Sequence, residues 1–420
     1  MSNSIGLRQK IKKSMRRTIL QSLRIAARPT LTYRSSLPRL ATPPKKLLLI
    51  RPDHLGDILL TTPALSLLRA SLPNTEITAL VGPWGAASLV GNPDVDKVVR
   101  CNFPGFSREP NANPFAPYLY ALQQSRRLRA EKYDAVINFR YDFWWGALLA
   151  YLADIPARFG FEWEEANPFQ NFSLSLSQIE LPEKLSPFGQ PSQHFSSLGL
   201  ALAKHLLQTY KVPMDLERVN VKLKFFPSPD DKRYVNLNLS EWGLERDERL
   251  VAIHPGTGAT LKLWTVEGFA AVADTLAERY GAKVVLTGGP QEVILLKNIT
   301  KICQNKPLYW DTSNSWGRLA ALFERCDLVL GLDSGPLHLA VAVDVPSIHL
   351  FGPTDPSIFG PWGNPELHRV IRTEIDLPCC PCGILDADRS CWRGGYCMRT
   401  IKVSQVFGEV DKLLDRRPHS

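Results

Sequence analysis

Two carboxylates and a histidine follow an apolar run in the stretch RPDHLGDILLTTPAL, residues 51–65. The apolar spacing that resumes after them indicates a helix, so these polar side chains lie at a strand-to-helix turn. Asp57 suits either of two roles there: it can cap the helix, or it can act as a general base on a reacting hydroxyl. On the local pattern alone, Asp53 and His54 are equal candidates for chemistry.

A second turn, DSGPLHL, has the residue types of an anion site. Pro336 suits the first turn of a helix, because its missing N–H would have no intrahelical partner there. The N–H groups of Ser334, Gly335 and Leu337 can converge at the helix N-terminus, which favours a diphosphate. Asp333 can then hold a sugar hydroxyl. An ordinary strand-to-helix turn, with Asp333 or Ser334 as the N-cap, explains the pattern equally well.

Two further loops carry candidate contacts to a nucleotide. The loop HPGTGATLKLW, residues 254–264, offers Lys262 as a point charge for a phosphate and Thr257 as a hydroxyl donor. A solvated surface loop is the alternative interpretation. In TGGPQE, residues 287–292, Glu292 can accept hydrogen bonds from a ribose. A helix-start carboxylate that meets the helix dipole is the default interpretation of this residue.

Five of the eight cysteines cluster near the C-terminus. They are Cys379, Cys380, Cys382, Cys391 and Cys397. In a cytosolic chain such a cluster is more typical of metal binding than of disulfides, and Cys379 and Cys382 have zinc-knuckle spacing. A structural zinc held by Cys379, Cys382, Cys391 and Cys397 is one interpretation. Structural thiols, reduced or disulfide-linked, are an equally open one, and a catalytic thiol is disfavoured.

The turns described above need a scaffold, and beyond residue 45 strand and helix patterns alternate. Strands are predicted at residues 45–50, 76–82, 96–100, 134–139, 157–161, 249–254, 282–289, 327–333 and 346–352. Helices are predicted at 57–73, 117–132, 144–154, 194–207, 265–281, 290–303, 315–326 and 335–344. Such alternation implies βαβ units and a parallel sheet covered on both faces. Residues 160–193 lack this periodicity and are predicted to form a long loop.

The pattern pauses near residues 222–235 and restarts, which predicts an α/β protein with two Rossmann-like doubly wound domains. A length of 420 residues also suggests two domains. The predicted segments are a basic arm (1–45), a first domain (46–225), a second domain (226–372), and a Cys-rich segment with a C-terminal helix (373–420). Ligands bind at the carboxyl ends of such strands, so the turns would face each other across a central cleft. No Gly-x-Gly-x-x-Gly fingerprint occurs, which argues against a nicotinamide cofactor.

The net charge of +9 belongs to the arm rather than to the folded body. Residues 1–46 hold twelve of the 50 Lys and Arg residues and no Asp or Glu, which leaves 38 basic against 41 acidic residues. A basic amphipathic helix on an anionic membrane surface is predicted from the spacing. Its apolar positions are Ile11, Met15, Ile19, Leu23 and Ala26, and its basic positions are Lys12, Lys13, Arg16, Arg17 and Arg24.

A disordered tail and a transit peptide are the alternative interpretations of the arm. Nucleic-acid binding is disfavoured, because no basic patch with interleaved aromatic residues continues into the body. No membrane-spanning apolar run and no signal peptide are expected from the sequence.

Three motifs together resemble glycosyltransferase family 9, the lipopolysaccharide heptosyltransferases. They are LGDILLTTPAL, the HPG loop with its K-x-W, and DSGPLHLAVAVDVPSIHLFGPTDP, in this order within residues 46–372. The resemblance implies the two-domain GT-B fold. It also implies transfer of heptose from ADP-heptose to the lipopolysaccharide inner core, with inversion and without an obligatory metal.

The resemblance also implies roles for individual residues. Asp57 matches the general base proposed for the family, Lys262 matches the lysine at the donor phosphate, and Asp333 matches the contact to the sugar. The turn beneath the diphosphate is matched by Ser334, Gly335, Leu337 and His338. Glu292 matches a ribose-binding glutamate only loosely. Asp53 and His54 are then left with supporting or acceptor-side roles.

The expected function is therefore an inverting glycosyltransferase that uses a nucleotide sugar and a lipid-linked glycan acceptor. No cofactor beyond the structural zinc is expected, and the expected place is the cytoplasmic face of the inner membrane, reached through the arm. Another GT-B transferase with a different donor, or a non-catalytic module that binds sugar nucleotides or glycans, is the alternative. A sugar epimerase is disfavoured, because the LGD and GPTDP motifs have no place in it.

Overall fold

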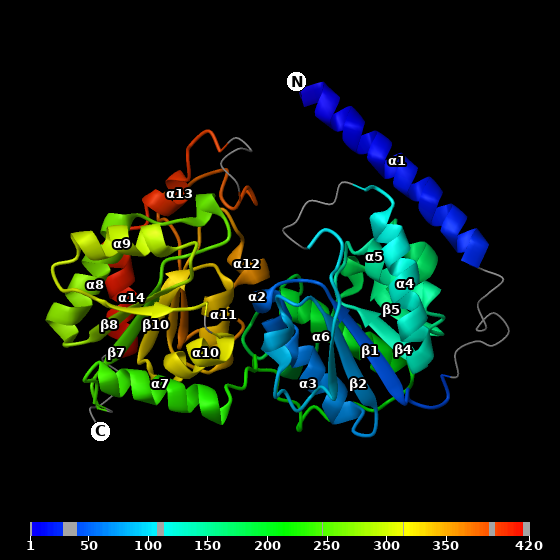
Figure 1. Cartoon of the computed structure of the whole chain (residues 1–420), viewed down its shortest axis with the longest axis horizontal. Helices are drawn as coiled ribbons and strands as arrows, with labels where there is room; N and C mark the ends of the chain where they lie inside the picture. Colours follow the sequence, from blue (N-terminus) through cyan, green and yellow to red (C-terminus); the bar gives the residue numbers. More distant parts are fainter. Residues whose placement is uncertain are drawn as a thin grey trace.

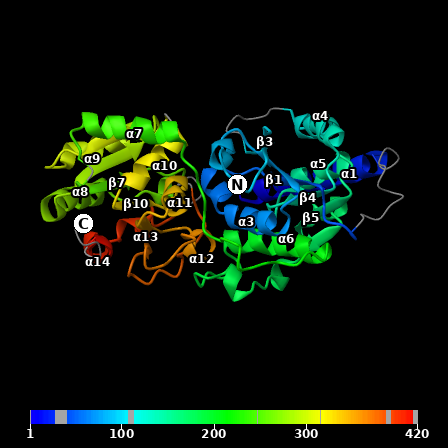
Figure 2. The same ribbon diagram turned by 90° about the horizontal axis from the view of Figure 1, so that it is seen from below.

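The computed structural model describes residues 2–27, 40–106, 113–245, 247–313, 315–385 and 391–414, with side chains described from residue 14 onward. Two lobes lie side by side, with the N-terminal half of the chain on the right of Figure 1 and the C-terminal half on the left. The view from below shows the same two lobes (Figure 2). The predicted doubly wound α/β fold with two Rossmann-like units is confirmed.

The N-terminal lobe contains a six-stranded parallel sheet in the order β3-β2-β1-β4-β5-β6. Its strands are β1 (Lys46–Arg51), β2 (Glu76–Val81), β3 (Lys97–Arg100), β4 (Ala135–Asn138), β5 (Ala157–Phe161) and β6 (Phe172–Leu174). Its helices are α2 (Leu55–Leu59), α3 (Thr62–Ser71), α4 (Ala116–Glu131), α5 (Trp144–Leu152) and α6 (Phe195–Thr209). The central strands are nearly continuous apolar runs, as burial on both faces requires. Strand β6 lies within residues 160–193, where only a loop was predicted.

The C-terminal lobe contains a second six-stranded parallel sheet, in the order β12-β11-β10-β7-β8-β9. Its strands are β7 (Leu250–His254), β8 (Lys283–Gly288), β9 (Leu308–Asp311), β10 (Leu328–Leu332), β11 (Ser347–Leu350) and β12 (His368–Ile371). Its helices are α7 (Pro229–Glu241), α8 (Val266–Tyr280), α9 (Val293–Ile302), α10 (Trp316–Arg325), α11 (Gly335–Ala342), α12 (Pro356–Phe359), α13 (Tyr396–Arg399) and α14 (Val403–Leu414). Strands β9 and β12 were not predicted, whereas the C-terminal helix was.

The two sheets share one topology. When the strands of each lobe are counted from its own first strand, both orders read 3-2-1-4-5-6. The strand order of such a sheet reverses between its first and fourth strands, and ligands bind at the carboxyl ends of these two strands. In the N-terminal lobe these are β1 and β4, and in the C-terminal lobe they are β7 and β10. The predicted catalytic and donor residues therefore lie near the strands at whose carboxyl ends this topology favours ligand binding.

The helix predicted at residues 57–73 is two helices, α2 and α3. Pro63 is the reason, because it has no N–H and its ring would clash with the carbonyl of Leu59, four residues earlier in a continuous helix. The Thr62 hydroxyl donates instead to the Leu59 carbonyl at 2.7 Å. The break leaves α2 as a short helix that carries Asp57 at the edge of the lobe.

The lobes meet where the first turns of α2 and α11 touch each other. We call this contact, formed by residues 55–57 and 333–338, the domain junction. A Cβ atom on Gly56 would lie 3.0 Å from the ring of His338 and 3.1 Å from the Gly335 Cα, so glycine permits the approach. A second contact joins the start of α6 to the segment after α12, where His194 Nε2 lies 3.1 Å from the Gly360 carbonyl oxygen.

The N-terminal arm begins with one long helix, α1 (Ser2–Ala27), which lies against the outer side of the N-terminal lobe (Figure 1). Leu20 is buried there, and Leu23 packs beside it. Arg16 forms an ion pair with Glu165 at 3.2 Å, and Arg17 forms one with Glu164. The predicted helix is therefore confirmed, and part of it contacts the N-terminal lobe. Contact of the arm with a membrane surface stays a prediction.

The rest of the arm is only partly described. The side chains of Ile11, Lys12 and Lys13, as well as residues 28–39, lie outside the described residues. Within the described ranges, no helix has both the length and the apolar character needed to cross a membrane.

Candidate active site

Asp57 lies at the domain junction, in the first turn of α2. His54 is the N-cap of this helix, so the interpretation of Asp57 as its cap is wrong. The Asp57 side chain is 33% exposed, and its Oδ1 lies 4.0 Å from Arg51 Nη2. That separation is an ion pair but is too long for a hydrogen bond.

The position of Asp57 changes its acid–base behaviour. Burial raises its pKa from 3.8 to about 6, and the carboxylates of Asp53 and Asp333 act in the same direction. The guanidinium groups of Arg51 and Arg140 oppose this change in pKa. A carboxylate with a pKa near the working pH is a better proton acceptor than an ordinary aspartate, as a general base requires.

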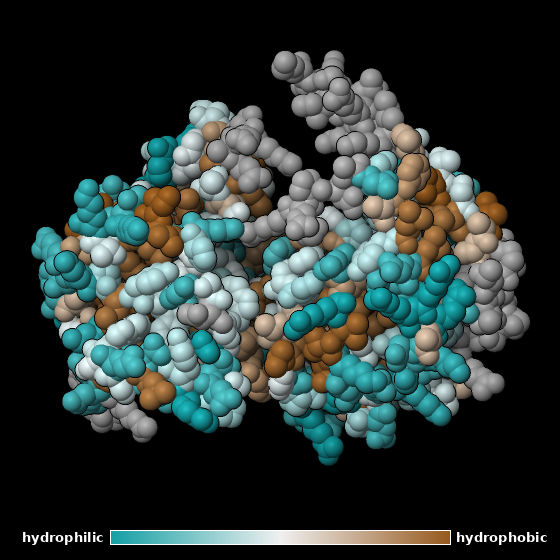
Figure 3. Space-filling view, viewed as in Figure 1, coloured by the Kyte–Doolittle hydropathy of each residue, from teal (hydrophilic) through white to brown (hydrophobic). Residues whose placement is uncertain are grey.

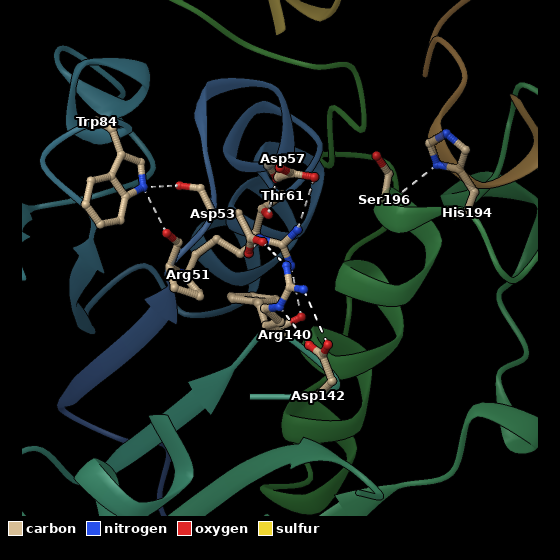
Figure 4. Close-up of polar contacts among 11 residues, drawn as sticks. Arg51, Asp53, Asp57, Thr61, Trp84, Arg140, Asp142, His194 and Ser196 are labelled. Atoms are coloured by element: carbon tan, nitrogen blue, oxygen red, sulfur yellow. Dashed lines mark hydrogen bonds and ion pairs between the residues drawn. The ribbon is translucent and has the colours of Figure 1, made fainter. Parts of the chain in front are cut away.

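Asp53 and His54 have different surroundings from Asp57. Asp53 is 2% exposed, and it forms ion pairs with Arg51 at 2.9 Å and with Arg140 (Figure 4). His54 is exposed, and its ring stacks on Trp84 with ring centroids 5.6 Å apart. The structure therefore places Asp53 inside the lobe in a supporting position. An acceptor-side role for His54 stays a prediction.

In the C-terminal lobe, Asp333 follows β10 and collects contacts from two other loops. Lys262 Nζ lies 2.7 Å from Asp333 Oδ2 and donates to the Asp333 carbonyl at 3.2 Å. Thr257 donates to the same carbonyl at 3.4 Å. The Thr354 hydroxyl donates to Asp333 Oδ2 at 2.7 Å. The structure thus brings three predicted residues together and adds Thr354, from the GPTDP motif.

The first turn of α11 differs in part from the predicted anion site. Ser334 is the N-cap, and its hydroxyl has no hydrogen-bond partner among the described residues. The Leu337 N–H donates to the Ser334 carbonyl at 3.1 Å, so the prediction that it points at an anion is wrong. His338 is buried, which lowers its pKa to about 4, and its Nδ1 has no partner in the described part of the chain. Gly335 lies against α2 at the junction.

Glu292 precedes α9 and holds its own loop. Its Oε2 accepts a hydrogen bond from the Gly289 N–H at 2.8 Å. A Cβ atom on Gly256 would lie 3.1 Å from the carboxyl carbon of Glu292. The loops after β7 and β8 are therefore in contact. One carboxylate oxygen thus serves the loop, and the ribose role stays a prediction.

The C-terminal cysteines gather around one pocket. The pocket is lined by Cys379, Cys380, Cys382, Cys391 and Cys397, together with Leu261 and Pro353. All eight cysteines are free, so the structure contains no disulfide. Among the described residues, no three His, Cys, Asp or Glu side chains are arranged to hold a metal ion. The prediction of a structural zinc therefore stays untested.

The cysteine pocket braces the loops around Asp333. Leu261, next to Lys262, donates its N–H to the Leu385 carbonyl at 3.3 Å. Cys382 donates its N–H to the Pro353 carbonyl, next to Thr354, at 3.0 Å. The C-terminal segment therefore supports two of the loops that contact Asp333.

Sequence reasoning missed two residues beside Asp57. Arg51 is the last residue of β1 and was quoted only as the start of the motif. Arg140 follows β4, whose carboxyl end adjoins that of β1 in the sheet. A basic residue at or just after the end of each of two neighbouring strands is the only signal that the sequence offers for this pair.

Comparisons with known proteins relate this chain to sugar transferases. A family model described as "Glycosyltransferase family 9 (heptosyltransferase)" matches residues 121–382. Lipopolysaccharide heptosyltransferase 3 of Escherichia coli is 28% identical over 375 residues, which are 86% of this chain and 96% of that protein.

Two solved structures resemble the whole fold. A glycosyl transferase of family 9 from Veillonella parvula covers 89% of this chain and 98% of its own, at 24% identity and a TM-score of 0.72. Escherichia coli heptosyltransferase WaaC with ADP covers 87% of this chain and 99% of its own, at 18% identity and a TM-score of 0.61. At these identities the likeness shows the fold alone, and it confirms the predicted GT-B architecture.

Proposed function

Because the chain belongs to glycosyltransferase family 9 (heptosyltransferase) and is a glycosyltransferase, we propose that it transfers a heptose from ADP-heptose to the lipopolysaccharide core or another cell-surface glycan, with inversion. One observation carries the proposal: Asp57 faces the Lys262–Asp333 pair across the domain junction, close enough for Asp333 to raise its pKa. The names of the relatives, lipopolysaccharide heptosyltransferase 3 and heptosyltransferase WaaC with ADP, support the choice of sugar and nucleotide.

The C-terminal lobe holds the donor in this proposal. Lys262 gives two contacts to Asp333, and its ammonium group has three N–H donors, so one stays available for a phosphate oxygen. The Ser334 hydroxyl and the N-terminus of α11 add further donors for the diphosphate. Asp333 accepts from Lys262 and Thr354, and its carboxylate is placed to accept a sugar hydroxyl as well.

Asp57 acts as the general base. It removes the proton of the acceptor hydroxyl while that oxygen attacks the anomeric carbon on the face opposite ADP. The bond from the anomeric carbon to the diphosphate breaks, and ADP leaves with the electron pair. Lys262 and the first turn of α11 stabilise the charge that grows on the leaving diphosphate. A positioned base contributes about 10²–10⁴-fold to such a step.

The decisive experiment is Asp57→Asn. We expect kcat with ADP-heptose and a lipid-linked acceptor to fall by about 10²–10⁴-fold, because the base is lost. The affinity for ADP, measured by calorimetry, should stay the same, because Asp57 belongs to the other lobe. The matched control is Asp96→Asn, which removes an aspartate of the N-terminal lobe that contacts Arg69 and Ile77. Near-normal turnover by Asp57→Asn would show that another group is the base.

A different nucleotide sugar is the alternative donor. A comparison of ADP-, UDP- and GDP-sugars with the native enzyme, by thermal shift and by release of the nucleotide, separates these two donors. A ligand that binds only the native state raises the melting temperature. Stabilisation and turnover with a UDP- or GDP-sugar, and not with ADP-heptose, would transfer the proposal to that donor.

We also propose that the enzyme works at the cytoplasmic face of the inner membrane, where a lipid-linked acceptor is accessible. The basic arm favours an anionic surface. Met15 and Ile25 are exposed on α1, and Phe115, Leu119 and Leu122 are exposed along α4. Figure 3 shows a brown, apolar area on the side of the N-terminal lobe where α4 and α5 lie. Apolar and basic side chains together are what a peripheral membrane protein needs.

The proposed transfer uses the charge of Lys262 and requires no cofactor. We expect full activity in buffer with EDTA after dialysis, because the residues named above perform every step. Metal analysis of protein purified without chelators tests the structural zinc separately. About one zinc per chain, bound through the cysteines, would support the zinc prediction, and its absence would leave structural thiols.

A further inference from the structure

Arg51, the last residue of β1, is a buried cation next to the proposed base. Its Nη1 donates to the Phe139 carbonyl at 3.0 Å, and its guanidinium lies 5.2 Å from the centre of the Phe195 ring. Its Nε lies 2.9 Å from Asp53 Oδ2. These contacts leave Nη2 on the side of Asp57 (Figure 4).

Arg51 is held in turn by a chain of alternating charges. Asp53 contacts Arg51 with one carboxylate oxygen and Arg140 with the other. Arg140 pairs with Asp142 at 2.7 Å. The chain runs from the carboxyl end of β4 to that of β1 and ends at Asp57, as the dashed lines in Figure 4 show. Fixed partners on both sides leave the Arg51 guanidinium little freedom.

The Arg51 Nη2 group has hydrogen-bonding capacity to spare. It is buried and has no hydrogen-bond acceptor in the described part of the chain. A buried donor without an acceptor is unfavourable, and the carboxylate of Asp57, 4.0 Å away, is the group that can satisfy it. A shift of about 1 Å by this half-exposed side chain would form the hydrogen bond.

We propose that Arg51 is a positioning residue for the transfer reaction: it keeps the Asp57 carboxylate ionised and oriented, and the Asp53–Arg140 pair fixes Arg51 in place. The inference rests on the proposed base role of Asp57. The proposal also gives the buried Asp53 a role. Without its carboxylate, Arg51 and Arg140 would lie next to each other with no anion between them.

Charged and titratable groups from the neighbouring elements affect the ionisation of Asp57. In the N-terminal lobe they are Arg51, Asp53, Arg140 and Asp142, and across the junction they are Asp333, Lys262 and His338. Lys262 is already paired with Asp333. His338 lies against Gly56 and is uncharged at neutral pH, since burial lowers its pKa to about 4. Arg51 is therefore the cation nearest to Asp57, and the other groups cannot supply its charge if it is removed.

The test replaces Arg51 with Met, which keeps an unbranched apolar side chain and removes the guanidinium charge. Carbon-13 NMR of aspartate-labelled protein, with Asp57→Asn to assign the signal, follows the Asp57 carboxyl without any substrate. We expect its pKa to rise by about one unit or more, which is a tenfold gain in proton affinity. The pH at which kcat reaches half its maximum should rise equally, while the affinity for ADP stays the same.

Three further variants make the result specific. Arg51→Lys retains the charge, so its Asp57 titration should stay near that of the native enzyme, while kcat falls because the orientation is lost. Asp53→Asn removes a carboxylate that raises the pKa of Asp57, so it should move the titration to lower pH, opposite to Arg51→Met. Arg158→Met removes another buried arginine of the lobe, one that donates to backbone carbonyls, and should leave the titration unchanged. If Arg51→Met does not fold, Arg51→Lys and Asp53→Asn carry the test.

An unchanged Asp57 titration in folded Arg51→Met, or an equal shift in Arg158→Met, would overturn the proposal. These outcomes are distinct from a failure of the proposed function. Full activity of Asp57→Asn would remove the base role, whereas the NMR titration depends on neither the donor nor the acceptor.

Discussion

At the scale of residues, Asp57 and Asp333 are two carboxylates on opposite sides of the domain junction with different surroundings. Asp333 receives Lys262 and Thr354, each at 2.7 Å. Within the described ranges, the Asp57 carboxylate has an ion pair with Arg51 alone, at 4.0 Å. Two carboxylates whose surroundings differ in this way can divide the work of a site. Asp333 is suited to anchor a ligand, and Asp57 is suited to take a proton.

The pH dependence of catalysis follows from the raised pKa of Asp57. We expect kcat/KM to rise with pH through about 6, because the base must be ionised. Asp57→Glu should change the pH at which kcat/KM rises, while the affinity for ADP stays constant over the same pH range. The measurement is kcat/KM from pH 5 to 8, with circular dichroism as the check on folding. A profile that stays level from pH 5 to 7 would contradict the assignment.

The same group affects stability with the opposite sign. The pKa of Asp57 is raised in the fold, so the unfolded chain loses this proton first, and stability falls as pH rises from about 4 to 6. Asp57→Asn should therefore raise the melting temperature at pH 7 while it lowers turnover. A lower melting temperature would mean that the carboxylate stabilises the fold.

Lys262 contacts Asp333, and in the proposed function it also contacts the donor phosphate. We expect Lys262→Ala to weaken ADP binding by roughly 10- to 100-fold, because a charged contact of about 1.5–3 kcal/mol is lost. The melting temperature should also fall, because the buried Asp333 loses its cation. Thr354→Val is the matched control: it removes one neutral donor to Asp333 and leaves the phosphate contact. Unchanged ADP affinity in Lys262→Ala, measured by calorimetry, would refute the phosphate role.

Sequence reasoning could place the donor residues, because Thr257, Lys262 and Asp333 each follow a predicted strand of one parallel sheet. It could not find Arg140, which contacts Asp53 from 87 positions away in the chain. It was wrong about the N–H of Leu337, because α11 begins with a tight turn that uses this donor internally. Contacts within one turn and across distant strands depend on coordinates that spacing does not provide.

At the scale of elements, the contact of α2 with α11 depends on Gly56. We expect Gly56→Ala to lower kcat and to separate the lobes, because its Cβ would press on His338 at 3.0 Å and on backbone at 3.1 Å. Gly199→Ala, in α6 of the N-terminal lobe, is the matched control, since its Cβ would meet nothing closer than 3.5 Å. Small-angle scattering and kcat measure the two effects. Equal behaviour of both variants would mean that the close approach has no role.

Helix α4 is predicted to bind membrane together with the arm. We expect Leu119→Ser with Leu122→Ser to lower binding to phosphatidylglycerol vesicles in a flotation assay, because two exposed apolar side chains are lost. Leu237→Ser removes an equally exposed leucine from α7, in the other lobe, and should have no effect. High salt should weaken what binding remains, through the arm. Equal loss in both variants would make the effect unspecific.

The elements that the sequence missed share a physical cause. Strands β6, β9 and β12 are short, and most of their residues are only partly buried, so their apolar pattern is weak. Helix α8 could be predicted with its ends, because Thr265 caps it and Gly281 ends it in a left-handed conformation. Strong local signals are readable from sequence, whereas edge strands form because a neighbouring strand already exists.

At the scale of the whole molecule, buried histidines make the fold sensitive to acid. Burial lowers the pKa of His194, His254, His338 and His368 to about 4, and it also lowers that of His349 well below its usual value. The unfolded chain binds these protons from pH 6.5 downward, so stability is lost as pH falls from 6.5 through 4. All five lie in the C-terminal lobe or at its contact with α6.

We expect the melting temperature to fall steeply between pH 6.5 and 4, with the C-terminal lobe unfolding first. The Ser347 hydroxyl lies 2.9 Å from His368 and 2.8 Å from His349, so protonation of this group disrupts buried hydrogen bonds. Differential scanning calorimetry from pH 4 to 8 measures the effect, and His368→Asn should reduce the slope. A melting temperature independent of pH in this range would contradict the prediction.

The common strand order of the two sheets has an evolutionary consequence. Each half of the chain has its own parallel sheet, its own reversal of strand order and its own polar cluster. Mutation can therefore remodel the acceptor half while leaving the nucleotide half as it is. A chimera joined between α6 and α7 would inherit its choice of donor and its choice of acceptor from different parents.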